Sequence, residues 1–348
     1  MKKAISLLVV LVLLTMVFVG CGSPAEDTPE DTTADTPVDT DEPGTEDDTP
    51  ATPPVETDEP GEQFVIGINN FGQANFFARI GRYVMMEEIE VAGHVVMDSV
   101  TADINSRIAA IEAKIAAGVD AIIIQEGDIE LARPALEEAR AQGIIIASLG
   151  AGDADFVDLF VASDEYELGR LAAMEMVYFM GGEGSVLEIY NPAGAMIRAR
   201  RESMHEVVAN YPGISVDFGF VYAWPDFFPD ILSQTEALIR ANPNPGDIAG
   251  VFATFDGAGY AAAAAFREAG LTDYVVIVGI DGDPEAYREM LLPDSPFKAT
   301  VAQDPETMAI EIVAGVIALL RGENVPQRIE IPGIVIRVEN IPEGWDDD

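Results

Sequence analysis

The chain has 348 residues, and 61 acidic side chains against 19 Lys and Arg give it a net charge of −42. Such a charge repels phosphate backbones and anionic lipid surfaces, so we expect no nucleic acid partner. The single cysteine, Cys21, excludes a disulfide within the chain. The two histidines, His94 and His205, lack the spacing of metal ligands, so we expect no metal and no cofactor.

The N-terminus has the pattern of an export signal. Two lysines precede an apolar run of 16 residues, Ala4 to Val19, which is shorter than the roughly 20 residues of a membrane-spanning helix. Phe18-Val19-Gly20-Cys21 resembles a bacterial lipobox, although Phe18 and Val19 depart from the usual Leu and Ala or Ser. The resemblance implies a signal peptide over residues 1–20 and a lipid on Cys21, which attaches the protein to the membrane. The alternative is an uncleaved N-terminal anchor.

Residues 21–63 differ in composition from the rest of the chain. From Gly22 to Gln63 there are fifteen Asp or Glu, no Lys or Arg, and many Thr and Pro. Such a segment cannot bury a core, and its like charges repel one another. We therefore expect a disordered, acidic tether between the anchor and the folded part.

From Phe64 onward, short β-branched runs alternate with amphipathic stretches, as in a series of βαβ units. The expected strands fall into two groups, first 64–70, 95–98, 120–125 and 144–149, then 185–190, 214–221, 250–254 and 274–280. Helices are expected between them, for example an Ala-rich one over 260–269. The roughly 285 residues of this region exceed one ordinary domain. The sequence therefore predicts an α/β fold of two Rossmann-like lobes with parallel sheets.

The candidate site lies in the segments that follow the expected strands, because open parallel sheets bind ligands at the carboxyl ends of their strands. These segments are 70–77, 125–128, 150–153, 191–198, 223–228, 254–256 and 281–283.

Several short motifs occur in the order found in one family. They are Asn75-Phe76-Phe77, Ser163-Asp164, Arg198-Ala199-Arg200, Val278-Gly279-Ile280-Asp281-Gly282 and Ala299-Thr300-Val301-Ala302-Gln303. Their order resembles the type I periplasmic binding proteins, in particular the ribose and galactose group that serves sugar ABC transporters. The resemblance implies an N-terminal lobe of residues 64–163 plus 304–330 and a C-terminal lobe of 164–303 plus 331–348, joined by a hinge. It also implies a sugar-like ligand, an ABC permease as partner and, we expect, a monomer.

Sugar hydroxyls both donate and accept hydrogen bonds, which suits fork-like side chains, and the C–H faces of a sugar suit flat rings. The candidate ligand-binding residues are Asn75, Phe76, Phe77, Arg198, Trp224, Phe227, Phe255, Asp256, Asp281 and Gln303. The resemblance implies that the first Arg of the Arg-Ala-Arg motif, here Arg198, contacts the ligand. Gly150-Ala151 and Phe255 stand where that group carries polar residues, so one wall should be roomier and another more apolar than in a ribose site.

Two other functions stay open. A receptor that presents its ligand to a chemotaxis or sensor-kinase partner has the same sequence features. Gly257-Ala258-Gly259-Tyr260-Ala261-Ala262 has the form of a dinucleotide fingerprint, with Asp281 placed as a ribose-binding acid, which would indicate an NAD-dependent oxidoreductase. The export signal and the like charge of Asp256 beside a pyrophosphate disfavour that function, so we assign no catalytic residue. Asp153, Asp155 and Asp158 are interpreted as exposed loop acids rather than a calcium site.

Overall fold

The structure, a computed structural model, describes residues 62–345. The expected signal peptide (1–20), the lipid site at Cys21 and all of the expected tether except its last two residues lie outside this range. Within residues 62–345, no helix is long and apolar enough to cross a membrane.

The strands are β1 (Val65–Phe71), β2 (Val95–Thr101), β3 (Ala121–Gln125), β4 (Ile145–Leu149), β5 (Leu159–Ala162), β6 (Gly184–Tyr190), β7 (Ile214–Val221), β8 (Gly250–Ala253), β9 (Val276–Asp281), β10 (Phe297–Ala302), β11 (Arg328–Glu330) and β12 (Ile334–Arg337). The α-helices are α1 (Phe76–Val91), α2 (Ile104–Ala117), α3 (Arg133–Ala141), α4 (Glu165–Met180), α5 (Ala195–Val208), α6 (Phe227–Ala241), α7 (Asp256–Glu268), α8 (Pro284–Met290) and α9 (Pro305–Leu320).

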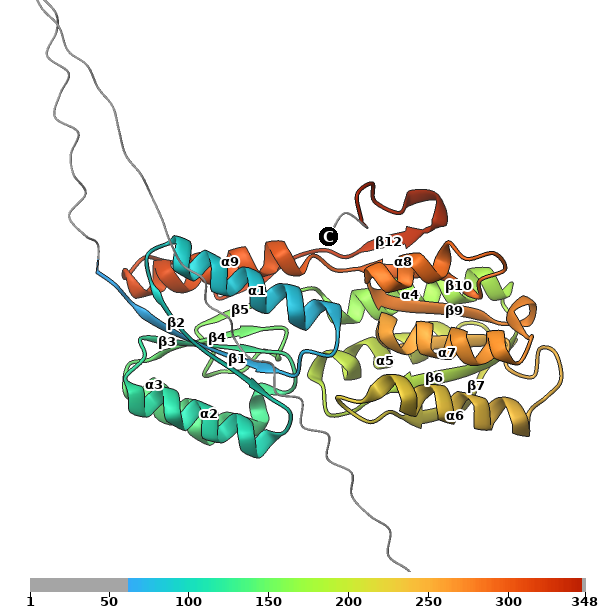
Figure 1. Cartoon of the computed structure of the whole chain (residues 1–348), viewed down its shortest axis with the longest axis horizontal. Helices are drawn as coiled ribbons and strands as arrows, with labels where there is room; N and C mark the ends of the chain where they lie inside the picture. The colour runs from blue at the N-terminus through green and yellow to red at the C-terminus, as the bar shows by residue number, and fades with distance from the viewer. Residues whose placement is uncertain (1–61, 346–348) are drawn as a thin grey trace, which may run out of the picture. The chain divides into compact units, whose positions relative to one another are not determined.

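The first sheet contains six parallel strands in the order β11-β5-β4-β3-β1-β2. Helices α1 and α9 pack on one of its faces, and α2 and α3 pack on the other (Figure 1). Every residue of the central strand β3, Ala-Ile-Ile-Ile-Gln, is buried, as a strand covered on both faces requires.

The second sheet has the order β12-β10-β9-β8-β6-β7, and β12 pairs antiparallel with β10 while the other pairs are parallel. Helices α4 and α5 cover one face, and α6, α7 and α8 cover the other (Figure 1). The two sheets therefore repeat one βαβ architecture.

The chain passes between the two sheets three times. It leaves the first sheet after β5, returns through α9 after β10, and leaves again between β11 and β12. At the second passage, the side chain of Asp304 accepts a hydrogen bond from the backbone N–H of Thr307, and Pro305 is the first residue of α9. This combination of N-cap and Pro begins the helix directly after the passage.

The α/β class with two largely parallel sheets is confirmed. All eight expected strands are present, and their ends differ from the expected ones by no more than three residues. The sequence did not predict β5, β10, β11 and β12 as strands. β5, β11 and β12 contain only three or four residues each, which is too short to show an alternation of apolar and polar positions.

Candidate functional site

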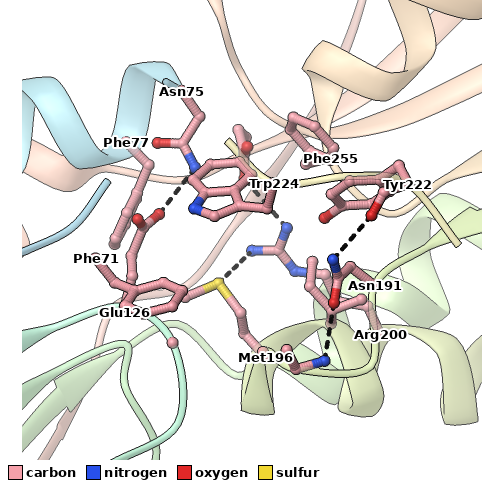
Figure 2. Close-up of a pocket in the computed structure, with 15 residues that line it drawn as sticks. Phe71, Asn75, Phe77, Glu126, Asn191, Met196, Arg200, Tyr222, Trp224 and Phe255 are labelled. Carbon is pink, nitrogen blue, oxygen red and sulfur yellow. Dashed lines mark hydrogen bonds and ion pairs between the residues drawn. The ribbon is translucent and has the colours of Figure 1, made fainter. Parts of the chain in front are cut away.

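A pocket of about 80 Å³ lies where the strands of both sheets end. This volume is far below the roughly 300–1,000 Å³ of sites for drug-sized molecules, so the pocket is too small for a ligand of that size. Its lining residues are Phe71, Asn75, Phe77, Glu126, Gly127, Asn191, Ala193, Gly194, Met196, Ile197, Arg200, Tyr222, Trp224, Phe255 and Asp281 (Figure 2). They come from the last residues of β1 and β9 and from the loops and helices that follow β1, β3, β6, β7 and β8, as expected for the carboxyl edge of parallel sheets.

On the side of the first sheet, the pocket is lined by the carboxylate of Glu126. Its Oε1 accepts a hydrogen bond from Nδ2 of Asn75 at 2.9 Å, and Oδ1 of Asn75 in turn caps α1 by accepting from the N–H of Ala78 at 2.7 Å. Glu126 has a positive φ of 57°, a strained conformation for a residue with a side chain. Burial raises the pKa of Glu126 to about 7. The chain thus holds this acid in the pocket at some energetic cost.

On the side of the second sheet, a buried guanidinium organises the pocket. Only 1% of the Arg200 side chain is exposed, and its Nε donates to Oε2 of Glu165 at 2.6 Å. Its Nη1 donates to the carbonyl oxygen of Thr254 at 2.8 Å and to Oδ1 of Asp281 at 3.2 Å. The same oxygen of Asp281 accepts from Nε2 of Gln303 at 2.8 Å. Burial acts to lower the pKa of Arg200, but the carboxylates of Glu165 and Asp281 outweigh it and keep the group protonated.

Aromatic rings form the apolar part of the pocket. Phe71 and Phe77 come from the first lobe, and Trp224 and Phe255 from the second. Trp224 stacks on Phe227 with ring centroids 6.0 Å apart and meets Phe255 edge to face at 6.4 Å. The indole Nε1 of Trp224 is buried and has no hydrogen-bond partner among the described residues. A buried donor of this kind favours a ligand that offers an acceptor.

The two lobes contact each other at the edge of this pocket. The backbone N–H of Ala195 donates to the carbonyl oxygen of Gly127 at 3.2 Å, and Nη2 of Arg198 lies 2.7 Å from Oδ2 of Asp128. The space beside Gly150, where the sequence predicts a roomier wall, is occupied, because a Cβ at this position would lie 3.2 Å from the methyl group of Met196.

Of the candidate residues, Asn75, Phe77, Trp224, Phe255 and Asp281 line the pocket. Phe227 and Gln303 lie behind it, where they support Trp224 and Asp281 respectively.

Phe76 and Arg198 do not line the pocket, and the Arg198 side chain is 49% exposed. Residues two apart on a helix point in nearly opposite directions, so only one arginine of the Arg-Ala-Arg motif can face the pocket, and in this structure it is Arg200.

Asp256 lies beneath the pocket instead of in its wall. Its Oδ2 accepts hydrogen bonds from the N–H groups of Gly282 and Asp283, both at 2.8 Å, and from Oγ1 of Thr300 at 2.9 Å. Asp256 is fully buried, and burial together with the charge of Asp281 raises its pKa to about 7. In this structure Asp256 therefore stabilises the turn that carries Asp281.

The sequence did not single out Phe71, Glu126, Asn191, Met196, Arg200 and Tyr222, although all six line the pocket. The rule that ligands bind after strand ends places Phe71, Glu126, Asn191 and Met196 in candidate segments. It does not rank them, and Arg200 and Tyr222 lie just outside those segments.

The glycines of the possible dinucleotide fingerprint are used for packing. A Cβ at Gly257 would lie 2.4 Å from the ring of Phe255, and a Cβ at Gly259 would lie 2.3 Å from the ring of Phe297. The glycines therefore let α7 approach these rings closely. Among the described residues, no three His, Cys, Asp or Glu are grouped as metal ligands.

Residues 66–324 match the family described as periplasmic binding protein domain. The ribose import binding protein RbsB of Bacillus subtilis (strain 168) is 25% identical over 278 residues, which cover 78% of this chain and 86% of that protein. The D-apiose import binding protein of Actinobacillus succinogenes is 27% identical over 214 residues, covering 61% of this chain and 67% of that protein. An ABC sugar transporter subunit from Rhodobacter sphaeroides 2.4.1 has a TM-score of 0.76 at 25% identity and covers 80% of this chain and 99% of that structure.

The family match covers all of the residues that line the pocket and most of both sheets, and the edge strands β11 and β12 follow it in the chain. The two-lobed fold and the position of the pocket agree with the match. The chain belongs to the periplasmic binding protein family, whose members bind solutes outside the cytoplasm.

Proposed function

We propose that the protein captures a small, sugar-like solute between its two lobes and delivers it to an ABC importer. The observation that carries this proposal is the pocket itself, in which polar side chains and aromatic rings from both lobes meet. The relatives named for ribose and D-apiose import support a sugar-like ligand. The pocket needs no catalytic group for this task, because binding and release involve no covalent change.

The proposed function includes closure of the lobes on the ligand, because each lobe contributes part of the pocket. Glu126 belongs to the first lobe and Asp281 to the second, so a ligand that contacts both stabilises the closed arrangement. The three passages of the chain, near Ser163, Gln303 and Ile331, serve as the hinge in this proposal. The lobes are then residues 64–163 plus 304–330 and 164–303 plus 331–348.

The attachment to the membrane is a second part of the proposal. Cleavage before Cys21 and lipid transfer to its thiol would anchor a monomeric receptor, and residues 21–63 would serve as its acidic tether. The order of basic, apolar and small residues at the N-terminus supports this assignment.

Intrinsic fluorescence tests the position of the ligand site, because the chain has two tryptophans. Trp224 lines the pocket, whereas Trp345 lies at the C-terminal end against Tyr287. We expect a sugar or polyol found by a thermal-shift screen of the full chain to change the fluorescence of wild-type protein and of Trp345→Phe. The change should disappear in Trp224→Phe. A signal that is lost in Trp345→Phe and kept in Trp224→Phe would contradict the proposed site.

A further inference from the structure

The acidic and basic groups of the pocket do not balance. Among its lining residues, the ionisable groups with opposite charges are the acids Glu126 and Asp281 and the cation Arg200. The guanidinium of Arg200 is already shared between Glu165 and Asp281, through the 2.6 Å and 3.2 Å contacts described above. Arg200 therefore pairs with the second lobe's own acids, and Glu126 forms no ion pair among residues 62–345.

The cation next to Glu126 does not reach its carboxylate either. Arg107 is fully buried, and its Nη1 donates to the backbone carbonyl oxygen of Glu126 at 2.7 Å. Its Nη2 donates to the carbonyl oxygen of Gln125 at 2.9 Å, and its Nε donates to Oδ1 of Asn69 at 2.8 Å. Arg107 thus holds the strained backbone of Glu126 in place. Its charge lowers the pKa of Glu126, but it makes no hydrogen bond to the Glu126 carboxylate.

Each acid of the pocket has one oxygen without a donor among residues 62–345. Oε1 of Glu126 accepts from Asn75, whereas no described group donates to Oε2. Oδ1 of Asp281 accepts from both Arg200 and Gln303, whereas no described group donates to Oδ2. The pocket therefore presents two carboxylate oxygens, one from each lobe, to a ligand.

The surrounding rings suit a cation as well as a sugar face. Phe71, Phe77, Trp224 and Phe255 line the pocket together with Glu126 (Figure 2). Asp281 lines the same pocket. A desolvated cation is attracted to the face of an aromatic ring, most strongly to that of Trp. Burial, and after it the charge of Asp281, raise the pKa of Glu126, and the hydrogen bond from Asn75 and the charges of Arg107 and Arg200 offset only part of this rise.

A neutral hydroxyl can donate to a carboxylate but cannot offset its charge, whereas an ammonium group does both. We propose that the solute carries a protonated amine as well as hydroxyl groups, and that this amine binds Oε2 of Glu126 in the field of Asp281. A hydroxyl or ring oxygen of the same solute accepts from Nε1 of Trp224. The ligand class is then an amino sugar or amino polyol. This inference rests on the proposed function, because it concerns the same pocket.

Matched ligands test the inference on the full chain in detergent by titration calorimetry. The pairs are D-glucosamine with D-glucose, D-galactosamine with D-galactose, and glucamine with glucitol, and N-acetyl-D-glucosamine serves as the neutral amide. We expect at least one amine to bind about tenfold or more tightly than its hydroxyl partner, and acetylation to abolish this preference, since a charge-assisted hydrogen bond is roughly twice as strong as a neutral one.

Glu126→Gln tests the residue, because Gln keeps the shape and the acceptor for Asn75 but removes the charge. In this variant, the ratio of the affinity for the amine to the affinity for its hydroxyl partner should fall to about one. Glu130→Gln removes the same charge from an exposed position on the following turn and should keep the preference. Circular dichroism of the unliganded variants checks that both are folded.

The outcomes separate this inference from the proposed function. If the neutral sugars or polyols bind as tightly as the amines or more tightly, the inference is wrong and the proposed function stands. An amine preference that survives in Glu126→Gln also rejects the inference. If neither amines nor neutral solutes bind, both proposals fail.

Discussion

Replacement of Arg200 by Met removes the cation on which the second lobe's half of the site is built. The change eliminates the hydrogen bonds of Arg200 to Glu165, to Asp281 and to the carbonyl oxygen of Thr254. Loss of one partner from a buried ion pair costs about 3–5 kcal/mol, because the remaining charges stay buried. At about 2–4 °C per kcal/mol for a domain of this size, the melting temperature should fall by about 6–20 °C.

Arg198→Met is the matched control, because it makes the same substitution two residues earlier on α5. Arg198 is half exposed, and its loss removes the contact with Asp128. An exposed ion pair contributes about 0–1 kcal/mol, so the melting temperature should change by no more than a few degrees. Differential scanning calorimetry of the two variants measures the contrast. Equal losses in both variants would refute the distinction between the two arginines.

The pH dependence of Arg200→Met gives a second check. Burial already raises the pKa of Glu165 and Asp281 above their usual values in the presence of Arg200, and removal of the guanidinium should raise both further. A folded-state pKa above the unfolded one means that the folded state binds more protons, so stability falls as pH rises through this window. The deficit of Arg200→Met relative to wild type should therefore be smaller at about pH 5 than at about pH 8. A deficit independent of pH would show that the carboxylates are not the cause.

Two further predictions concern Lys114 and Cys21. Lys114 is buried with its Nζ 2.6 Å from Oγ of Ser99, and burial lowers its pKa to about 8, so Lys114→Met should stabilise the protein by roughly 1–3 kcal/mol at about pH 7. This gain in stability should shrink between about pH 8 and pH 10.5, where folded Lys114 has already lost its proton. Urea denaturation measures the free energy of unfolding, and Lys298→Met, at a half-buried lysine, is the control. A Lys114→Met variant that is less stable than wild type would contradict the argument. Cys21→Ala should abolish labelling by radioactive palmitate and leave ligand affinity unchanged, whereas persistent labelling would show that the anchor lies elsewhere.

Most of the fold could be predicted from local patterns. A strand such as β3, with four consecutive apolar residues, is recognisable because burial on both faces of a parallel sheet demands such a run. The start of α9 could also be predicted from the sequence, because the N-cap Asp304 and the following Pro305 determine it through contacts within one helical turn. The short strand β11 at the sheet edge could not be predicted, because its three residues are too few to show a pattern of apolar and polar positions and form a strand by pairing with β5.

The candidate site was predicted less completely, because side-chain direction depends on distant contacts. Asp281 follows a strand and lines the pocket, as the rule for parallel sheets indicates. Asp256 also follows a strand, but its carboxylate accepts hydrogen bonds from the backbone N–H groups of Gly282 and Asp283, in the turn after β9. Glu126 lay in a candidate segment without being singled out, because neither its strained backbone nor the hydrogen bonds of Arg107 that hold it are visible in the order of residues.

The sequence by itself determined the α/β class, the two groups of strands and the edge at which the site lies, since these follow from periodicity and from the chemistry of strand ends. The tertiary structure decided which side chains enter the pocket. The clearest case is the Arg-Ala-Arg motif on α5, where both arginines have the same chemistry and only the rotation of the helix separates them. That rotation depends on close packing with α4, where a Cβ at Gly169 would lie 2.3 Å from the carbonyl oxygen of Arg200. A contact between residues 31 positions apart thus turns Arg200 inward and leaves Arg198 at the surface.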